Sequence, residues 1–426
     1  MIATSPEIKQ FRAQFDHARS ESSDPSWLRH LRARAMERFE ALGFPTTRHE
    51  EWKYTSVQPI AETTFRGAGG TASLADVTRA IGDSAIRLVF VNGRYVPELS
   101  SADGLPTGVR VSNVAASLDS AEDHLGRYVS IADQHFVALN TALFTDGAYI
   151  RVPSGKVVET PIHVLYLGVS GGGPVASHVR NLYVVEENAQ ATIVETYAGE
   201  GTYFTNVVTE IVESADANLD HYKVQIESEG AYHVATQRLE QAGPSVFSSH
   251  NISFGGALVR NDINSRLGGE YIESTINGLY VVNGRQHVDN HTAIDHAMPN
   301  CASHELYKGI MDGRSTGVFN GKIFVRQDAQ KTDAKQTNQN LLLSRDAVID
   351  TKPQLEIYAD DVRCTHGATV GQLDSDALFY LRSRGIGLAD ARGLLVHAFA
   401  SDVLNRIKID SLRERMEEAL SRKLAV

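Results

Sequence analysis

The sequence predicts a mainly β protein whose core is a parallel β-helix of short strands, with α-helical regions at both ends. Three observations lead to this prediction. Short runs rich in Val, Ile, Thr and Tyr follow one another over residues 151–374, with little helical periodicity. Small-residue turns separate these runs, the early ones about 25 residues apart. Both ends of the chain show the three-and-four spacing of amphipathic helices.

Residues 1–75 are expected to form an N-terminal helical region. Ile8, Phe11 and Phe15 keep helical spacing. The apolar residues of the next helix recur at steps of three and four: Leu28, Leu31, Ala35, Phe39 and Leu42. Ser26 is the expected N-cap of that helix.

Residues 76–150 are expected to form a small mixed α/β segment that leads into the core. Asn92-Gly93 lies between two β-rich runs and predicts a hairpin, because both residues accept a positive φ. Asp146-Gly147, within the segment 135–153, predicts another turn.

Residues 151–374 are expected to form the β-helix core. A repeat this short cannot bury its own apolar face, so neighbouring repeats must stack. The alternative, a β-sandwich, usually shows hairpin turns at a spacing of about 8–12 residues. The expected turns lie near residues 189, 217, 243, 268, 313 and 346.

Residues 375–426 are expected to form a C-terminal helical region. One helix carries an apolar stripe formed by Ala391, Leu394, Leu395, Ala398 and Phe399. The last helix places Leu412, Met416, Leu420 and Leu424 four residues apart. Either these helices cap the end of the β-stack or they dock a partner.

Composition narrows the function classes. The chain has 426 residues and a formal net charge of −11. A surface this acidic repels phosphate backbones and anionic lipids, so we expect neither nucleic acid nor membranes as general partners. With no apolar signal core at the N-terminus, we expect the protein in the cytoplasm. A reducing compartment argues against a disulfide between Cys301 and Cys364, the two cysteines.

Two enzyme motifs match the sequence only in part. Residues 313–317, GRSTG, fit G-x-S-x-G, but the following run alternates like a strand rather than starting a helix. Lys322 lacks the upstream glycine and the following Ser or Thr of a phosphate-binding loop. We therefore expect no catalytic Ser315 and no nucleotide hydrolysis by this chain.

Residues 287–304 gather groups that could bind a metal: His287, Asp289, His291, Asp295, His296, Cys301 and His304. Strand alternation would place His287, Asp289 and His291 on one face, a possible zinc or iron site. Their spacing matches no compact ligand set, so a structural role is the favoured interpretation.

Cys364 and His366 form the second candidate metal site. They lie two residues apart in an expected strand, so they share a face about 6.6 Å apart. Both side chains suit iron–sulfur chemistry. Two ligands are too few for a permanent cluster, so the site would be transient or completed by another subunit. The alternative is that Cys364 packs as a small hydrophobe.

Seven segments, in order along nearly the whole chain, carry a resemblance to a known family. They are GFPTTRHEEWKYTSV (43–57), LVFVNGRYVPELS (88–100), ALNTALFTDGAYIRVPSG (138–155), DHAMPNCASHELYKGIMDGRSTGVFNGKI (295–323), DAQKTDAKQTNQNLLLS (328–344), PQLEIYADDVRCTHGATVGQLD (353–374) and FYLRSRGI (379–386). The chain resembles the SufD branch of the SufB/SufD family, which belongs to the SUF iron–sulfur cluster assembly machinery. The resemblance implies a right-handed parallel β-helix. It also implies a scaffold role in a protein complex, with no enzymatic activity and no permanently bound cofactor.

The resemblance implies partners and site residues too. Family members pair with SufB and bind the ATPase SufC through their C-terminal helices, and SufD-like chains often form homodimers through β-helix edges. His366 matches the family's proposed ligand of the nascent cluster, which is shared with SufB, and Cys364 lies at the same interface. Alternatives outside this family are a stand-alone metal-storage protein that uses His287 and His291, or a β-helix polysaccharide-modifying enzyme.

Overall fold

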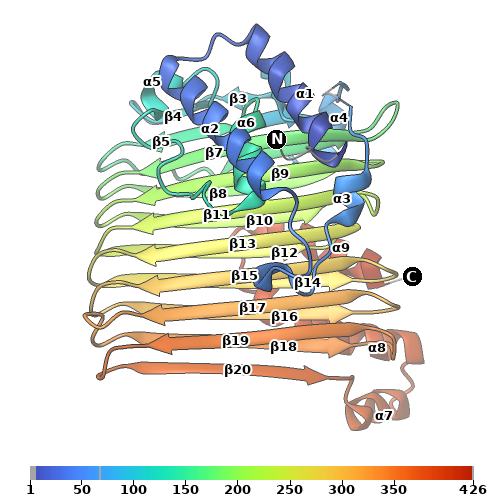
Figure 1. Ribbon diagram of the computed structural model, residues 1–426. Helices are drawn as coiled ribbons and strands as arrows, with labels where there is room; N and C mark the ends of the chain where they lie inside the picture. Colours follow the sequence, from blue (N-terminus) through green and yellow to red (C-terminus); the bar gives the residue numbers. More distant parts are fainter. Residues whose placement is uncertain (1–5, 67–68, 425–426) are drawn as a thin grey trace.

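The computed structural model describes residues 6–66 and 69–424, and it confirms the predicted β-helix with helices at both ends (Figure 1). Successive strands alternate between two sheets, and each core strand pairs in parallel with the strand two further along the chain. One coil therefore takes about 26 to 32 residues. No helix within the described ranges is long and apolar enough to cross a bilayer.

The two sheets run side by side along the molecule. Sheet A has the order β19-β17-β15-β13-β11-β9-β7-β5-β4, and sheet B has the order β2-β1-β6-β8-β10-β12-β14-β16-β18-β20, with β3 beside β1. Their inward-facing side chains meet in the enclosed space, which we call the lumen. Val259 and Val288 of sheet A, for example, share one cluster with Ile276 and Tyr280 of sheet B.

The strands before the regular coils are β1 (Ile86–Val91), β2 (Arg94–Tyr95), β3 (Ser101–Ala102), β4 (Arg110–Asn113), β5 (Ala148–Val152) and β6 (Ile162–Val169). The coils contain β7 (Val175–Val185), β8 (Gln190–Glu200), β9 (Tyr203–Glu213), β10 (Asn218–Ile226), β11 (Tyr232–Gln241), β12 (Ser245–Ser253), β13 (Leu258–Leu267), β14 (Ile272–Val282), β15 (His287–His296), β16 (Ala302–Met311), β17 (Thr316–Val325), β18 (Asp333–Leu342), β19 (Val348–Ile357) and β20 (Arg363–Gly371).

The expected turns between core strands are found. Asn188 and Asp216 have φ values of 56° and 57°, and Gly313 has a φ of 67°. These residue types accept the left-handed conformation at low cost, which explains why the turns can be read from the sequence. The Asn92-Gly93 hairpin between β1 and β2 is also confirmed, with φ values of 48° and 76°.

One expected turn is wrong. Asp146-Gly147 does not reverse a hairpin but joins α6 (His135–Leu143) to β5, and Asp146 forms a parallel bridge with Val179. A Cβ on Gly147 would lie 2.0 Å from the carbonyl oxygen of Arg180. This glycine therefore serves a close approach between two backbones rather than a turn.

Most helices of the N-terminal half cover the outer face of sheet A: α1 (Pro6–Glu21), α2 (Ser26–Leu42), η1 (Glu50–Trp52), α3 (Gln58–Glu62), α5 (Leu118–Ala121) and α6. Two others, α4 (Leu74–Ile81) and η2 (Pro97–Leu99), lie against sheet B. Phe11, Phe39 and Trp52 pack with Phe204 and Val234 of the sheet. Ser26 is not an N-cap, since Pro25 holds that position and Ser26 is already helical.

The C-terminal helices are α7 (Ser375–Ser383), α8 (Leu388–Leu404) and α9 (Asp410–Leu424). Val403, Met416 and Leu420 pack against Tyr222 and Ile252 on the outer face of sheet B. The helices α8 and α9 therefore lie along the side of the stack rather than across its last coil, so the capping alternative is wrong for them (Figure 1).

The expected apolar stripe on α8 is also wrong in part. Ala391 is buried as expected, but Leu394 is 52 % exposed. The residues that α8 buries against sheet B are Ala391, Val396, Ala400, Val403 and Leu404. On α9, Leu412, Met416 and Leu420 are buried as expected.

Candidate functional site

The last coil of the β-helix ends in two free strand edges. Strand β19 pairs with β17 and strand β20 pairs with β18, and each lies at the end of its sheet among the described strands. An open edge presents unpaired N–H and C=O groups that can extend a neighbouring sheet. At this end of the molecule, backbone groups of β19 and β20 are therefore left without a strand partner.

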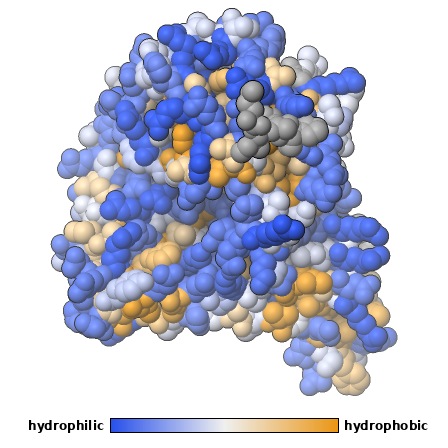
Figure 2. Space-filling view, in the orientation of Figure 1, coloured by the Kyte–Doolittle hydropathy of each residue, from blue (hydrophilic) through white to orange (hydrophobic). Residues whose placement is uncertain are grey.

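Apolar side chains are exposed around the same end, at the bottom of the space-filling view (Figure 2). The exposed residues are Val348, Ile357, Tyr358, Val370, Phe379, Tyr380 and Leu388. They come from β19, β20, the loop between them, α7 and α8. We call this set the end patch; an exposed apolar patch of this kind often marks an interaction surface.

Cys364 and His366 both lie on β20, as the sequence predicts for a strand. They share one face, and in register they lie opposite Ala334 and Gln336 of β18. Cys364 is half-buried and packs with a small apolar cluster that includes Ile323. His366 is exposed. The structure thus separates the two environments: the imidazole is accessible and the thiol is partly covered.

The Cys364 thiol has a raised pKa, because burial disfavours the thiolate and Asp333 adds a negative charge nearby. The thiolate is the form that binds metals. In the isolated chain Cys364 is therefore a weaker donor than a free cysteine would be.

Directly below His366, the lumen holds a polar ladder that sequence reasoning missed. In register, His366 of β20 follows Gln336 of β18, and Gln336 follows Glu305 of β16. The Gln336 Nε2 donates a hydrogen bond of 2.7 Å to Glu305 Oε2. Burial raises the pKa of Glu305 to about 7, opposed by hydrogen bonds from Thr292 and Gln336. The signal that could have revealed the ladder is the coil repeat, since residues one coil apart share a face.

A second missed feature is a group of fully buried charges in the middle of the lumen. Glu227 Oε2 lies 2.9 Å from His233 Nδ1, and His233 Nε2 lies 2.9 Å from Lys223 Nζ. Glu195 Oε1 lies 3.1 Å from His221 Nε2. Burial lowers the pKa of Lys223 to about 8. These contacts satisfy charges that would otherwise be costly inside the protein.

The predicted face of His287, Asp289 and His291 exists, but its side chains hold the N-terminal region. His287 Nε2 lies 2.8 Å from Thr55 Oγ1. His291 lies 3.4 Å from Glu51 and 3.1 Å from Asp289. In residues 6–66 and 69–424, no group of three or more His, Cys, Asp or Glu side chains is placed to hold a metal ion. The contacts of His287 with Thr55 and of His291 with Glu51 are those that a structural role of this segment would need.

The other members of this segment are dispersed. Asp295 pairs with Arg326 at 2.7 Å, and His296 Nε2 lies 2.8 Å from Ser303 Oγ inside the lumen. His304 is exposed on β16. Cys301 is buried, donates to the Gly269 carbonyl, and forms no disulfide with Cys364.

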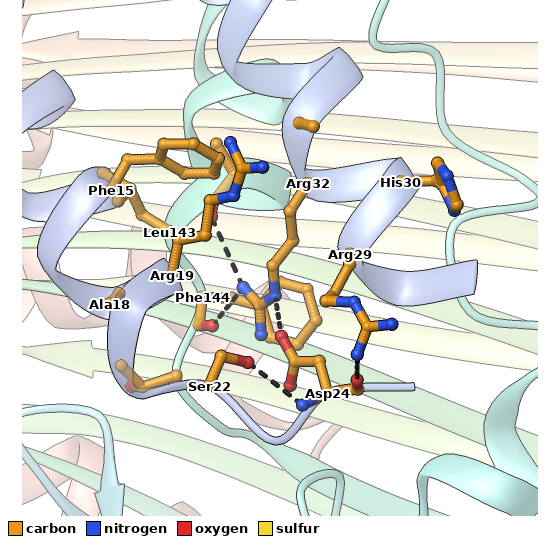
Figure 3. Close-up of a pocket in the computed structure, with 13 residues that line it drawn as sticks. Phe15, Ala18, Arg19, Ser22, Asp24, Arg29, His30, Arg32, Leu143 and Phe144 are labelled. Atoms are coloured by element: carbon orange, nitrogen blue, oxygen red, sulfur yellow. Dashed lines mark hydrogen bonds and ion pairs between the residues drawn. The ribbon is translucent and has the colours of Figure 1, made fainter. Parts of the chain in front are cut away.

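A pocket of about 430 Å³ lies between α1, α2 and the segment after α6, far along the chain from β20 (Figure 3). Arg32 donates to Asp24 Oδ2 at 2.8 Å and to the Phe144 carbonyl at 2.7 Å. Its guanidinium also lies over the Phe144 ring, 4.0 Å from the centroid. Because Arg32 is fully engaged by the protein, we interpret this pocket as a joint between helices.

Comparisons with known proteins point to one family. A family profile described as "SUF system FeS cluster assembly, SufBD core domain" matches residues 168–399, and one described as "SufBD protein N-terminal region" matches residues 7–164. A SufBD family iron–sulfur cluster assembly protein of Synechocystis sp. is 35% identical, over 97% of this chain and 95% of the relative. The SufD protein of Escherichia coli is 34% identical, over 91% of each chain. The SufD protein of Bacillus subtilis is 27% identical, over 94% of this chain and 95% of the relative.

Proposed function

The chain belongs to the SufBD family of the SUF iron–sulfur cluster assembly system, and from this we propose that it is a non-catalytic scaffold subunit that holds a nascent cluster at a subunit interface. The observation that carries the proposal is the accessible His366 on β20, whose outer edge is free. A single imidazole and a partly covered thiol cannot complete a cluster, so the remaining donors must come from another chain. Iron and sulfide are the cargo of this site rather than resident cofactors.

The partner at the last coil is a SufB-like paralogue. Two chains of the same architecture can pair β-edge to β-edge, which satisfies the free backbone groups of β19 and β20. The exposed side chains of the end patch, such as Val370 and Phe379, would become buried in such a contact. A second copy of this chain could occupy the same edge when the paralogue is absent.

The second partner is a SufC-like ATPase that docks on the C-terminal helices. A groove of about 850 Å³ lies between α8, the end of α9 and the turns of sheet B, lined by Leu388, Arg392 and Lys423 among others. The helices α7 and α8 follow β20 directly in the chain, so a movement of the ATPase would reach the edge strand. ATP-driven closure of two ATPase subunits would then strain the contact at the last coil and open it to iron and sulfide. We place this assembly in the cytoplasm.

The test is the variant His366→Ala in the complex with the SufB-like and SufC-like proteins of the same cell. We expect the three-protein complex to co-purify at wild-type yield, while anaerobic reconstitution gives little or no cluster by absorption spectroscopy. His304→Ala is the matched control, since His304 is also an exposed strand histidine. Cluster assembly at the wild-type rate by the His366→Ala complex would remove the ligand role.

A further inference from the structure

We propose that Gln336, held in place by Glu305, is the residue that positions His366: its free carbonyl oxygen accepts a hydrogen bond from one ring nitrogen, so that the other nitrogen points to iron. This inference rests on the proposed ligand role of His366 and adds two residues to that site.

The first step is the orientation of the Gln336 amide. Its Nε2 donates to Glu305 Oε2 at 2.7 Å. In this contact the amide nitrogen faces Glu305 and the amide carbonyl faces away from it. The Gln336 Oε1 atom is therefore turned elsewhere, and among the described residues this buried oxygen has no hydrogen-bond partner.

The second step is the location of that free oxygen. Gln336 and His366 are register partners on adjacent parallel strands, which lie about 4.8 Å apart, and both face the lumen side. Strand β20 is the last of sheet B, so the next side chain above Gln336 on this face is His366. A buried acceptor without a partner costs free energy, and the donor proposed for it is an imidazole N–H of His366.

The third step is the space around the amide. Gly321 of β17 faces Gln336 across the lumen, and a Cβ at that position would lie 2.3 Å from Gln336 Nε2. Sheet A thus leaves room for the Gln336 amide at Gly321, where a larger residue would displace the amide. Glu305 is buried below Gln336.

The chemistry explains why such a ladder is useful. A histidine that binds a metal through one nitrogen usually donates its other N–H to a carboxylate, a carbonyl or water. That bond fixes the tautomer and the ring orientation, and its loss typically lowers metal affinity about 10- to 100-fold. His366 is exposed and lies on an edge strand, so without such a bond its ring would rotate freely.

The experiment uses Gln336→Met in the full complex, because Met keeps the length and volume of the side chain but has no amide. We expect anaerobic Fe²⁺ affinity to fall about 10- to 100-fold while complex yield stays at wild type. The unfolding midpoint should fall somewhat, because Glu305 loses its hydrogen-bond donor. With ¹⁵N-histidine labelling, pulsed EPR of the reduced cluster should show a weakened or heterogeneous coupling to the ligating nitrogen. Gln354→Met is the matched control, since Gln354 lies on the other face of β19 in the same coil.

Two further variants decide the interpretation. Gly321→Ala leaves Gln336 intact but crowds its amide, so it should also lower Fe²⁺ affinity, which tests the position without changing the residue. In the His366→Ala background, Gln336→Met should cause no further loss, because both act on one ligand. Wild-type affinity and coupling in both Gln336→Met and Gly321→Ala, with His366→Ala inactive, would overturn the positioning role alone. If His366→Ala itself behaves as wild type, the proposed function fails as well.

Discussion

The contribution of Glu305 to the free energy of unfolding depends on pH. Its pKa is raised to about 7 by burial, whereas an unfolded glutamate titrates near 4.5. Between these two values the folded chain binds more protons than the unfolded chain, so the free energy of unfolding should fall as pH rises through this window. Above about pH 7 Glu305 is ionised in both states, so its contribution to the free energy of unfolding no longer changes with pH.

Glu305→Gln should remove this dependence. We expect the variant to exceed wild type in free energy of unfolding by about 3 kcal/mol at pH 8, and the difference to vanish near pH 4. Urea unfolding at a series of pH values measures the difference directly, because all other groups are common to both proteins. Parallel curves for the two proteins would show that Glu305 does not titrate as the burial implies.

The residues of the candidate site could be predicted only in part. The pair Cys364 and His366 is visible because two ligand-type residues alternate in a strand, although their binding role stays a prediction. Gln336 and Glu305 carry no such signal, since they are separated by about one coil and resemble ordinary polar strand residues. The burial of Gln336 and Glu305 in the lumen sets their hydrogen bonds and the pKa of Glu305. A local sequence pattern does not show how deeply a residue is buried.

At the scale of elements, η1 (Glu50–Trp52) acts as a clamp across sheet A. Arg260 of β13 lies over the Trp52 ring, 4.5 Å from its centroid, and donates to the Glu51 carbonyl at 2.8 Å. It also pairs with Asp289 at 2.6 Å. Arg260 pairs with Asp262 at 2.6 Å as well, so the clamp is fixed by a buried cation with four partners.

Arg260→Ala should destabilise the chain strongly. Removing one partner of a buried ion pair typically costs about 3–5 kcal/mol, and Asp289 would keep only His291 and Thr55 as partners. Arg238→Ala is the matched control, since the Arg238–Glu240 pair is partly exposed and such pairs contribute about 1 kcal/mol or less. Chemical denaturation of both variants checks the prediction, and equal losses would contradict it.

The helices show where sequence patterns fail at this scale. On α9 the apolar residues are few and lie four apart, so the sequence predicts which face of the helix is buried. On α8 apolar residues occur on all sides, from Leu394 to Ala400, so two or three stripes are equally possible. The choice between them is made by sheet B, which α8 contacts through β14 and β16. The division of the chain at residues 75, 150 and 374 stays a prediction.

At the scale of the whole molecule, the two ends of the stack differ. Helices and antiparallel strands cover the first coils, while the last coil leaves β19, β20 and the end patch open (Figure 1). A solenoid with one open end is expected to associate through it. We therefore expect the isolated chain to form dimers whose population depends on concentration.

Val370→Lys should shift this equilibrium toward the monomer. Val370 is 50 % exposed on β20, and a lysine on an edge strand opposes edge-to-edge pairing. Leu74→Lys is the control, because Leu74 is 56 % exposed on α4, outside the end patch. Light scattering across a dilution series gives the molar mass of each variant. If the molar mass falls equally for Val370→Lys and Leu74→Lys, or falls for neither variant, the chains do not associate through β20.

The clamp has a consequence for how the chain is made. Glu50 of η1 pairs with Lys352 of β19 at 2.7 Å, and 302 residues separate the two partners. Ribosomes add roughly 5–20 residues per second, so roughly 15–60 s pass between synthesis of the first partner and of the second. During this interval Glu50 and its neighbours in η1 cannot form their contacts with β19, because that strand has not yet been synthesised. Nascent chains arrested before residue 350 should therefore present this segment to chaperones and proteases.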